Sequence, residues 1–230
     1  MINSLRHTDL YDPQKYADKR IALIGVGTIG SHLALTLARM QVPFTIYDPD
    51  TIEAHNIATQ AYTRRDIGRY KVDAIAKQCE DIGAENVIGM GLRFDNPPNP
   101  LVHPSEHPYD IIVSCVDSMD ARREIAVTII ETGVSTLIHD ARVGAEQVEV
   151  YRYASAQEWL DAMPAQADTD PCGARFTAYT ANICAGLLAN NIKRELLGQS
   201  VPARILYDSA SSTFIKTNRE VPPSECLCND

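Results

Sequence analysis

Apolar residues occur along the chain either in short continuous runs or at intervals of three and four positions. The continuous runs are typical of strands buried on both faces, and they cover residues 21–24, 44–47, 86–90, 109–115 and 135–139. The spaced pattern predicts helices, and it covers residues 29–40, 68–82, 121–132 and 173–197. Because strands and helices alternate, we expect an α/β fold: a Rossmann-like, doubly wound, mostly parallel sheet.

The second half of the chain departs from this alternation. Residues 146–153 alternate apolar and polar side chains, which predicts a strand with one face in water, and residues 204–207 predict a last strand. We expect both as antiparallel additions to the sheet. Residues 154–172 are rich in Ala, Gln and Asp with little pattern, which predicts a mobile segment. The long helix that follows has small residues on its predicted inner face, which favours close helix packing within the chain or across a dimer: Ala178, Ala181, Ala185, Gly186 and Ala189.

Three glycines follow the first apolar run with the G-x-G-x-x-G spacing. Gly25 and Gly27 allow a sharp turn in which backbone N–H groups can approach a phosphate, and Gly30 allows the next helix to pack closely on the strand. Asp48 ends the second run, where a carboxylate can accept hydrogen bonds from ribose hydroxyls. A tight turn without a ligand is the alternative. The strand, helix and acid together favour a nucleotide site without saying which nucleotide it takes.

Composition narrows the class of protein. A chain of 230 residues with 45% hydrophobic residues can form one sizeable folded domain. Its net charge of −9 argues against nucleic acid or an anionic membrane as the main partner. The N-terminus lacks an apolar leader and no run is long enough to cross a membrane, so we expect a cytoplasmic protein whose six cysteines stay reduced. We divide the chain into an arm (1–19), a nucleotide-binding domain (20–216) and a polar tail (217–230).

Charged residues follow the predicted strand ends, where ligands of open α/β sheets collect. Asp48 and Asp50 follow the second strand and Asp117 follows the fourth, while Lys71 begins the helix after a long polar stretch. A triphosphate needs cations and a metal held by carboxylates, whereas a dinucleotide needs little beyond the helix N-terminus. Lys71 and Asp117, with Arg64 and Arg65 nearby in sequence, therefore favour ATP over NAD. Surface charges at loop ends are the alternative.

Three segments carry a family resemblance. D-P-D-T-I-E-A-H-N-I-A-T-Q at 48–60, D-I-G-x-x-K at 66–71 and C-V-D-S-M-D-A-R at 115–122 resemble the ThiF/MoeB/HesA family of ubiquitin-activating-enzyme-like adenylyltransferases. The likeness spans roughly residues 20–200. It implies adenylation, with ATP and Mg²⁺, of the C-terminal glycine carboxylate of a small ubiquitin-like or sulfur-carrier protein. It also implies a homodimer in which an N-terminal arginine such as Arg6 reaches the neighbouring site.

The resemblance also implies residue roles. Asp48 would hold the ribose, Lys71 would lie along the phosphates, Asp117 would hold Mg²⁺ or orient the α-phosphate, and Arg122 would support its loop. The whole implied nucleotide set is Gly25, Gly27, Thr28, Ile29, Gly30, Asp48, Asp50, Asn56, Gln60, Lys71, Val116, Asp117, Ser118 and Arg122.

Two features depart from the family pattern. Thr59 stands where the family usually has an arginine that contacts phosphate, and Arg64 or Arg65 is a candidate replacement. Many members also carry two C-x-x-C pairs for zinc. This chain has only the pair Cys226 and Cys228, so we expect no structural zinc.

Cys172 matches the position at which the family's cysteine takes the activated carboxyl as a thioester or persulfide. The following helix and Arg175 would lower the pKa of its thiol, whereas an incidental loop cysteine is the alternative. Cys79, Cys115 and Cys184 fall on apolar faces and are expected to be packing residues.

Two further groups are candidates near the site. His55, beside Asn56, would orient the loop, and the residues that end the fifth strand would line a groove for the partner's tail: His139, Asp140 and Arg142. The sequence thus predicts an activating enzyme for a small ubiquitin-like protein. An NAD-dependent oxidoreductase or a non-catalytic scaffold of the same fold is the alternative.

Overall fold

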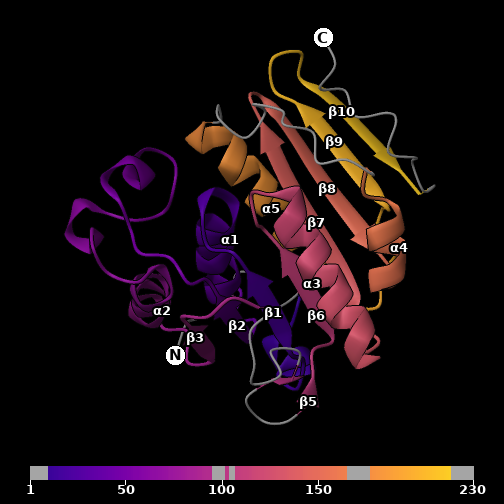
Figure 1. The fold of residues 1–230 in the computed structure, drawn as a ribbon, viewed down its shortest axis with the longest axis horizontal. Helices are drawn as coiled ribbons and strands as arrows, with labels where there is room; N and C mark the ends of the chain where they lie inside the picture. Colours follow the sequence, from indigo (N-terminus) through magenta and orange to yellow (C-terminus); the bar gives the residue numbers. More distant parts are fainter. Residues whose placement is uncertain (1–9, 95–101, 104–106, 165–176, 219–230) are drawn as a thin grey trace.

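A computed structural model describes residues 10–94, 102–103, 107–164 and 177–218. Its main feature is an eight-stranded sheet with the order β10-β9-β8-β7-β6-β1-β2-β3 (Figure 1). Neighbouring strands are parallel from β3 through β7 and antiparallel from β7 through β10. The strands are β1 (Ile21–Ile24), β2 (Phe44–Tyr47), β3 (Val87–Met90), β6 (Ile111–Ser114), β7 (Leu137–Gly144), β8 (Gln147–Tyr153), β9 (Arg204–Asp208) and β10 (Thr213–Thr217). A separate pair joins β4 (Val102–His103) to β5 (His107–Pro108).

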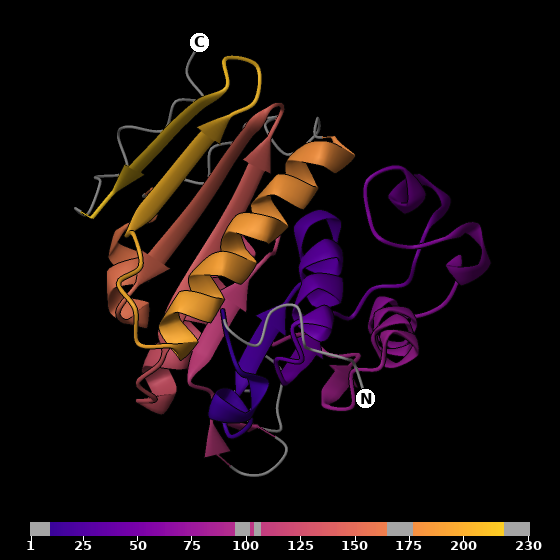
Figure 2. The same cartoon turned by 180° about the vertical axis from the view of Figure 1, so that it is seen from behind.

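Helices cover both faces of this sheet. The α-helices are α1 (Thr28–Arg39), α2 (Lys71–Ile82), α3 (Met119–Thr132), α4 (Ala156–Asp161) and α5 (Ala178–Leu196), and the 3-10 turns are η1 (Pro13–Tyr16), η2 (Ala54–Ala58) and η3 (Arg64–Asp66). Figure 1 shows α3 and α4 on the near face of the sheet, and Figure 2, the view from behind, shows α1 and α5 on the opposite face. This is the doubly wound architecture that the sequence predicted, with its antiparallel additions.

Each face of the sheet has its own apolar core. The larger core joins α1, α2 and α5 to the sheet, and the smaller one joins α3 and α4 to the other face around Trp159 and Tyr109. Every residue of β1, β2 and β6 is buried, as their continuous apolar runs predicted. The cysteines expected to pack, Cys79, Cys115 and Cys184, are buried.

The structure corrects four expectations about elements. Residues 156–161 form α4, whose Trp159 is fully buried, inside the segment expected to be mobile. Strand β10 was not predicted; it pairs with β9 and reaches Thr217, the first residue of the expected tail. The polar face of β8 is not in water, because Glu149 is buried against Arg204 of the neighbouring strand.

The fourth correction concerns α5. Of its small residues, Ala181, Ala185 and Ala189 are buried, and Ala185 and Ala189 pack in the larger core with α1 of the same chain, but Ala178 and Gly186 are exposed. No helix in the described ranges is both long and apolar enough to cross a membrane.

Candidate nucleotide site

The glycine turn joins the end of β1 to α1 without room for side chains. Gly25 has a φ of +84°, and its N–H donates to the carbonyl of Tyr47 at 2.8 Å. A Cβ on Gly25 would lie 2.9 Å from the carbonyl oxygen of Cys115, and one on Gly30 would lie 1.9 Å from the carbonyl oxygen of Gly25. Both positions therefore require glycine, which holds β1, β6 and α1 in close contact.

The N-terminus of α1 opens at this turn. Gly27 is the N-cap residue, so no side chain caps the helix, and no acidic residue lies in its first turn. The first N–H groups of a helix have no partner within the helix, and its dipole places partial positive charge there. Because α1 has 12 residues and its end is bare, its first turn at Thr28 and Ile29 suits an anion such as a phosphate.

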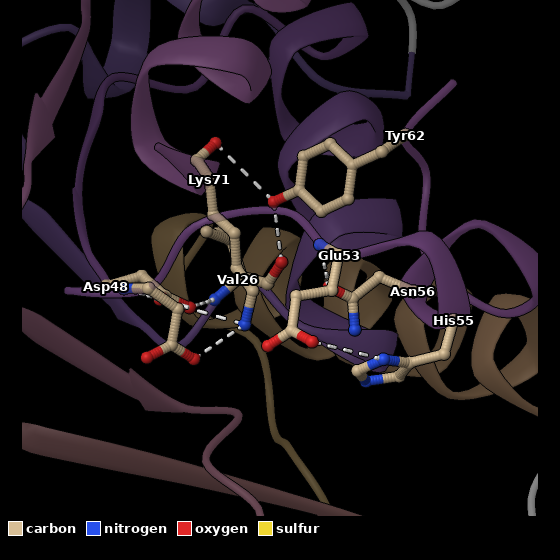
Figure 3. Close-up of polar contacts among 8 residues, drawn as sticks. Val26, Asp48, Glu53, His55, Asn56, Tyr62 and Lys71 are labelled. Carbon is tan, nitrogen blue, oxygen red and sulfur yellow. Dashed lines mark hydrogen bonds and ion pairs between the residues drawn. The ribbon is translucent and has the colours of Figure 1, made fainter. Parts of the chain in front are cut away.

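Asp48 lies beside this turn at the end of β2. Its carboxylate accepts hydrogen bonds from the N–H of Val26 at 2.8 Å and from the N–H of Asp50 at 2.9 Å (Figure 3). Burial raises the pKa of the Asp48 carboxyl, while Lys71 and the two backbone donors oppose that rise. Asp48 is therefore held in a fixed position by the turn that it faces.

Lys71 points back from the start of α2 to these carboxylates. Its Nζ lies 2.7 Å from Oδ2 of Asp50 and 3.9 Å from Oδ1 of Asp48. The lysine side chain is 9% exposed, whereas the Asp50 side chain is 62% exposed. The ammonium group of Lys71 is thus largely buried next to the glycine turn, while its partner Asp50 is accessible to water.

The polar stretch after β2 folds over α1. Asn56 is buried, and its side-chain oxygen accepts the N–H of Glu53 at 2.8 Å. The side-chain oxygen of Gln60 is buried without a hydrogen-bond partner, and its amide nitrogen lies 3.9 Å from where a Cβ of Gly27 would stand. Gln60 therefore faces the turn as the resemblance implied. His55 is on the surface, where it lies 3.6 Å from Glu53.

The end of β6 contributes a second acidic position. Val116 is half-buried and Asp117 is exposed, and Ser118 caps α3 by accepting the N–H of Ala121 at 3.1 Å. Since β1 and β6 are adjacent and parallel, Asp117 and the glycine turn lie beyond the same edge of the sheet. In the described part of the chain, no group of three or more His, Cys, Asp or Glu is placed to hold a metal ion.

Arg122 of α3 is buried against β7. Its guanidinium donates to Asp140 at 2.8 Å and to the carbonyl of Ala141 at 3.1 Å. Arg142 binds the other oxygen of Asp140 at 2.8 Å, and the indole N–H of Trp159 reaches the same oxygen at 3.3 Å. Arg122 thus ties α3 to β7, in keeping with a role in supporting the loop.

The three residues expected to end the fifth strand and line a groove lie inside β7, which continues to Gly144. His139 and Asp140 are fully buried, so they cannot line a groove for a partner's tail, whereas the Arg142 side chain is 20% exposed. Burial lowers the pKa of His139 to about 3, with a smaller contribution from Arg152, so its imidazole is neutral at physiological pH.

Two expected site residues, Arg64 and Arg65, make no contact with this cluster among those that the structure describes. Arg64 and Arg65 form the start of η3 and are exposed to solvent. Cys172 and Arg6 lie outside the described residues, as does Arg175 beside the cysteine.

Sequence comparison decides the family. The model of the ThiF family matches residues 3–229. The chain belongs to the ThiF family. This is the family to which the motifs at 48–60, 66–71 and 115–122 pointed.

Curated relatives of this ThiF-family chain include enzymes of modifier activation. The ubiquitin-like modifier-activating enzyme 5 of Drosophila mojavensis is 27% identical over 242 residues, which cover 94% of this chain and 59% of that protein. The ATP-dependent ubiquitin transferase-like protein Cap2 of Vibrio cholerae is 30% identical over 138 residues, 57% of this chain and 22% of its own length. The chain thus spans about three fifths or less of these relatives.

Solved structures support the fold. A crystal structure of E. coli MccB with MccA-N7isoASN superimposes with a TM-score of 0.72 at 19% identity, over 92% of this chain and 67% of that one. E. coli MccB with ATP gives a TM-score of 0.70 at 19% identity, over 92% and 67%. PaaA gives 0.69 at 17% identity, over 93% and 69%. At these identities the likeness establishes the fold alone.

Sequence reasoning missed one buried polar residue of this ThiF-family site. Tyr62 is 4% exposed, and its hydroxyl donates to the carbonyl of Val26 at 2.7 Å. A tyrosine inside a long polar stretch was the available signal, because a buried tyrosine hydroxyl usually has a partner.

Proposed function

We propose that this protein uses ATP to adenylate the C-terminal glycine carboxylate of a small ubiquitin-like or sulfur-carrier protein. The observation that carries the proposal is the bare N-terminus of α1 beside Asp48 and Lys71. A helix end, a cation and a ribose-facing carboxylate are what an adenine nucleotide needs at its phosphates and sugar. Membership in the ThiF family supports the same activity.

The nucleotide would lie across the carboxyl ends of β1, β2 and β6. Asp48 would accept the ribose hydroxyls, and Asn56, Gln60 and Lys71 would lie along the phosphates. The unpartnered buried oxygen of Gln60 supports a polar ligand there, because a buried polar atom normally has a partner. Asp50 would release Lys71 to the phosphates at small cost, since its own side chain is already largely in water.

Magnesium fits the residues at the end of β6. Asp117 offers a solvent-exposed carboxylate, and Mg²⁺ is usually held by one or two carboxylates together with phosphate oxygens and water rather than by a full protein cage. Asp117 would hold the ion, with Ser118 fixing the loop through its cap on α3. A bound Mg²⁺ would reduce the negative charge on the phosphates.

The reaction brings two anions together. A carboxylate oxygen of the partner's terminal glycine attacks the α-phosphorus in line, the bond from that phosphorus to the bridging oxygen breaks, and pyrophosphate leaves with the electron pair. The barrier is largely repulsion and positioning. Lys71 and the N–H groups of α1 would offset the charge that both groups bring to the site.

We propose that Cys172 then accepts the activated carboxyl. Its thiolate would attack the acyl carbon, form a thioester and release AMP. If a sulfane-sulfur donor had first converted Cys172 to a persulfide, the terminal sulfur would attack instead, giving the acyl persulfide and AMP. The location of Cys172 in D-T-D-P-C-G-A-R supports this step. Homodimer formation, a contribution of Arg6 to the neighbouring site and the domain limits at residues 20 and 216 stay predictions.

ATP–pyrophosphate exchange tests the proposal. Ubiquitin-like and sulfur-carrier proteins ending in Gly-Gly serve as probes, each beside the same protein with an amidated C-terminus. We expect exchange with at least one free carboxylate, none with its amide, and a loss of about 100-fold or more in Asp117→Ala. Equal exchange with the free and the amidated C-terminus would overturn the proposal, and so would binding of a nicotinamide nucleotide in place of ATP.

Variants of the other candidate residues test separate parts of the mechanism. Cys172→Ala is expected to exchange normally but to form no conjugate that a thiol reductant releases, and normal conjugation would remove Cys172 from the pathway. Arg64→Ala and Arg65→Ala test whether either arginine replaces the one missing at Thr59. Unchanged exchange in both would exclude that role.

A further inference from the structure

The hydroxyl of Tyr62 links the glycine turn to the start of α2. Its hydroxyl lies 2.7 Å from the carbonyl oxygen of Val26 and 3.5 Å from that of Lys71, so its single proton goes to Val26 (Figure 3). Burial raises the pKa of Tyr62 well above its usual value, with smaller contributions from nearby carboxylates, so the hydroxyl keeps that proton at physiological pH. The hydroxyl can therefore donate this hydrogen bond throughout the physiological pH range.

Val26 is held from both sides. Its N–H donates to Asp48 at 2.8 Å and its carbonyl accepts from Tyr62 at 2.7 Å. In a trans peptide the carbonyl of one residue and the N–H of the next point in opposite directions. The N–H of Gly27 must then point away from Tyr62, out of the buried side of the turn.

Gly27 is the N-cap residue of α1, and its φ of −75° and ψ of −137° place it outside the helix. A residue between two glycine positions has few steric restraints on its peptide planes. Without the Tyr62 hydroxyl, the Val26–Gly27 peptide would lose the contact that fixes its orientation on the carbonyl side. Asp48 would still hold the preceding peptide.

We infer that Tyr62 is a positioning residue that aims the Gly27 N–H at a phosphate of the bound nucleotide. The inference rests on the proposed function, because it needs a phosphate at the turn.

Binding of ATP, AMP and adenosine to Tyr62→Phe tests the inference. The variant keeps the ring and removes only the hydroxyl. We expect the dissociation constants of ATP and AMP to rise about tenfold, as for one hydrogen bond to a charged group, while that of adenosine stays within about twofold. A purely structural effect on the fold would weaken all three ligands alike.

Tyr16→Phe is the matched control. Tyr16 is also fully buried, and its hydroxyl contacts the carbonyl of Met40 at 3.5 Å, at the opposite end of the same helix. The control variant should therefore bind all three ligands like the wild type. Equal losses in both variants would mean that the hydroxyls act through the stability of α1, which would overturn the inference.

Two other outcomes are decisive. A wild-type protein that binds ATP and AMP no better than adenosine would overturn the proposed function and this inference together. A wild type that prefers the phosphorylated ligands, with Tyr62→Phe keeping the full preference, would overturn this inference alone.

If Tyr62→Phe does not fold, amide hydrogen exchange of the wild type still tests whether the Gly27 N–H faces a phosphate, as the inference requires. ATP and AMP should slow exchange at the Gly27 amide and adenosine should not. Equal protection by all three ligands, or none, would contradict the inference.

Discussion

The two halves of the sheet use charged residues in opposite ways. In the parallel half, the strands themselves are apolar and the charges lie beyond their carboxyl ends, as with Asp48 and Asp50 after β2. In the antiparallel half, the charges lie within the strands and pair across one face of the sheet, around Asp140 and around Glu149 with Arg204. In the parallel half, Asp50 and Asp117 reach water, whereas Asp140 and Glu149 of the antiparallel half are enclosed by protein.

The ion pairs of the two groups differ in how far water reaches the more exposed partner. In the pair of Arg122 and Asp140 the side chains are 5% and 0% exposed, whereas Asp50, the partner of Lys71, is 62% exposed. A pair that water already reaches can exchange its partner for a phosphate at small cost, but a fully buried pair cannot separate without leaving a charge in the protein interior. We therefore propose that the charges at the ends of β2 and β6 serve ligand binding and that those on the antiparallel face serve stability.

Removing Asp140 should have the largest effect. Asp140→Ala leaves Arg122 and Arg142 without the carboxylate that both bind, and Trp159 loses an acceptor. Breaking a buried ion pair costs about 3–5 kcal/mol. We expect a loss of that size in the free energy of unfolding, measured with urea.

Glu80→Ala is the control for this change. Glu80 pairs with Lys77 on the exposed face of α2, so its loss should change the free energy of unfolding by at most about 0.5 kcal/mol. Similar values for the two variants would contradict the distinction between the two groups of charges.

The sequence predicted the parallel half well for a physical reason. Its central strands β1, β2 and β6 are buried on both faces, so each appears as an unbroken apolar run, and the glycine turn has a fixed spacing. The edge strand β3 is partly exposed. The carboxyl ends of parallel strands meet at one edge, which is why Asp48 was expected there. Lys71 was expected to point back to the turn from the start of its helix, as it does, whereas Gln60 was named only through the family resemblance.

The antiparallel half was less predictable, because the burial of its residues depends on partners that are distant in the sequence. Glu149 reads as a solvent-facing residue, and only its pairing with Arg204, 55 positions later, shows that it is buried. Strand β10 is exposed at all but one position and is fixed mainly by pairing with β9, so its apolar pattern is weak. The α4 helix is short, and its buried Trp159 depends on Asp140 from a distant strand. Long-range partners of this kind leave no local periodicity.

Lys71→Met tests the other side of the comparison and should have the second-largest effect. The variant keeps the length and apolar stem of the side chain but removes the charge beside Asp48 and Asp50. We expect the rate of ATP–pyrophosphate exchange to fall about 100-fold, equivalent to ~2.7 kcal/mol. The control is Lys77→Met on the exposed face of the same helix, which should exchange at the wild-type rate.

A different result for Lys71→Met would break the comparison. If this variant kept the wild-type exchange rate but lost as much stability as Asp140→Ala, Lys71 would belong with the structural pairs. The measurement therefore needs both an exchange rate and a urea midpoint for each lysine variant.

The pH dependence of stability gives the smallest and most specific contrast, because the two aspartates shift in opposite directions. Burial alone would raise the pKa of Asp140, but Arg122 and Arg142 hold it below its usual value, whereas burial raises the pKa of Asp48 despite Lys71. A lowered pKa adds stability above the unfolded value of about 3.9, and that stability is lost as pH falls through the folded pKa. A raised pKa has the opposite effect, because stability is lost as pH rises from about 3.9 through the folded pKa.

Asparagine variants isolate the two contributions. Urea unfolding between about pH 3 and pH 7 should show the stability advantage of wild type over Asp140→Asn shrinking on acidification. For Asp48→Asn the difference between wild type and variant should instead move in favour of the wild type as pH falls toward about 4, by ~1.4 kcal/mol for each unit of pKa shift. Asparagine keeps an oxygen that can accept the N–H of Val26, so the turn itself is preserved. Parallel pH profiles for the two variants would mean that the carboxylate beside the glycine turn is as fully paired as the one on the antiparallel face, and the division between ligand-binding and structural charges would fail.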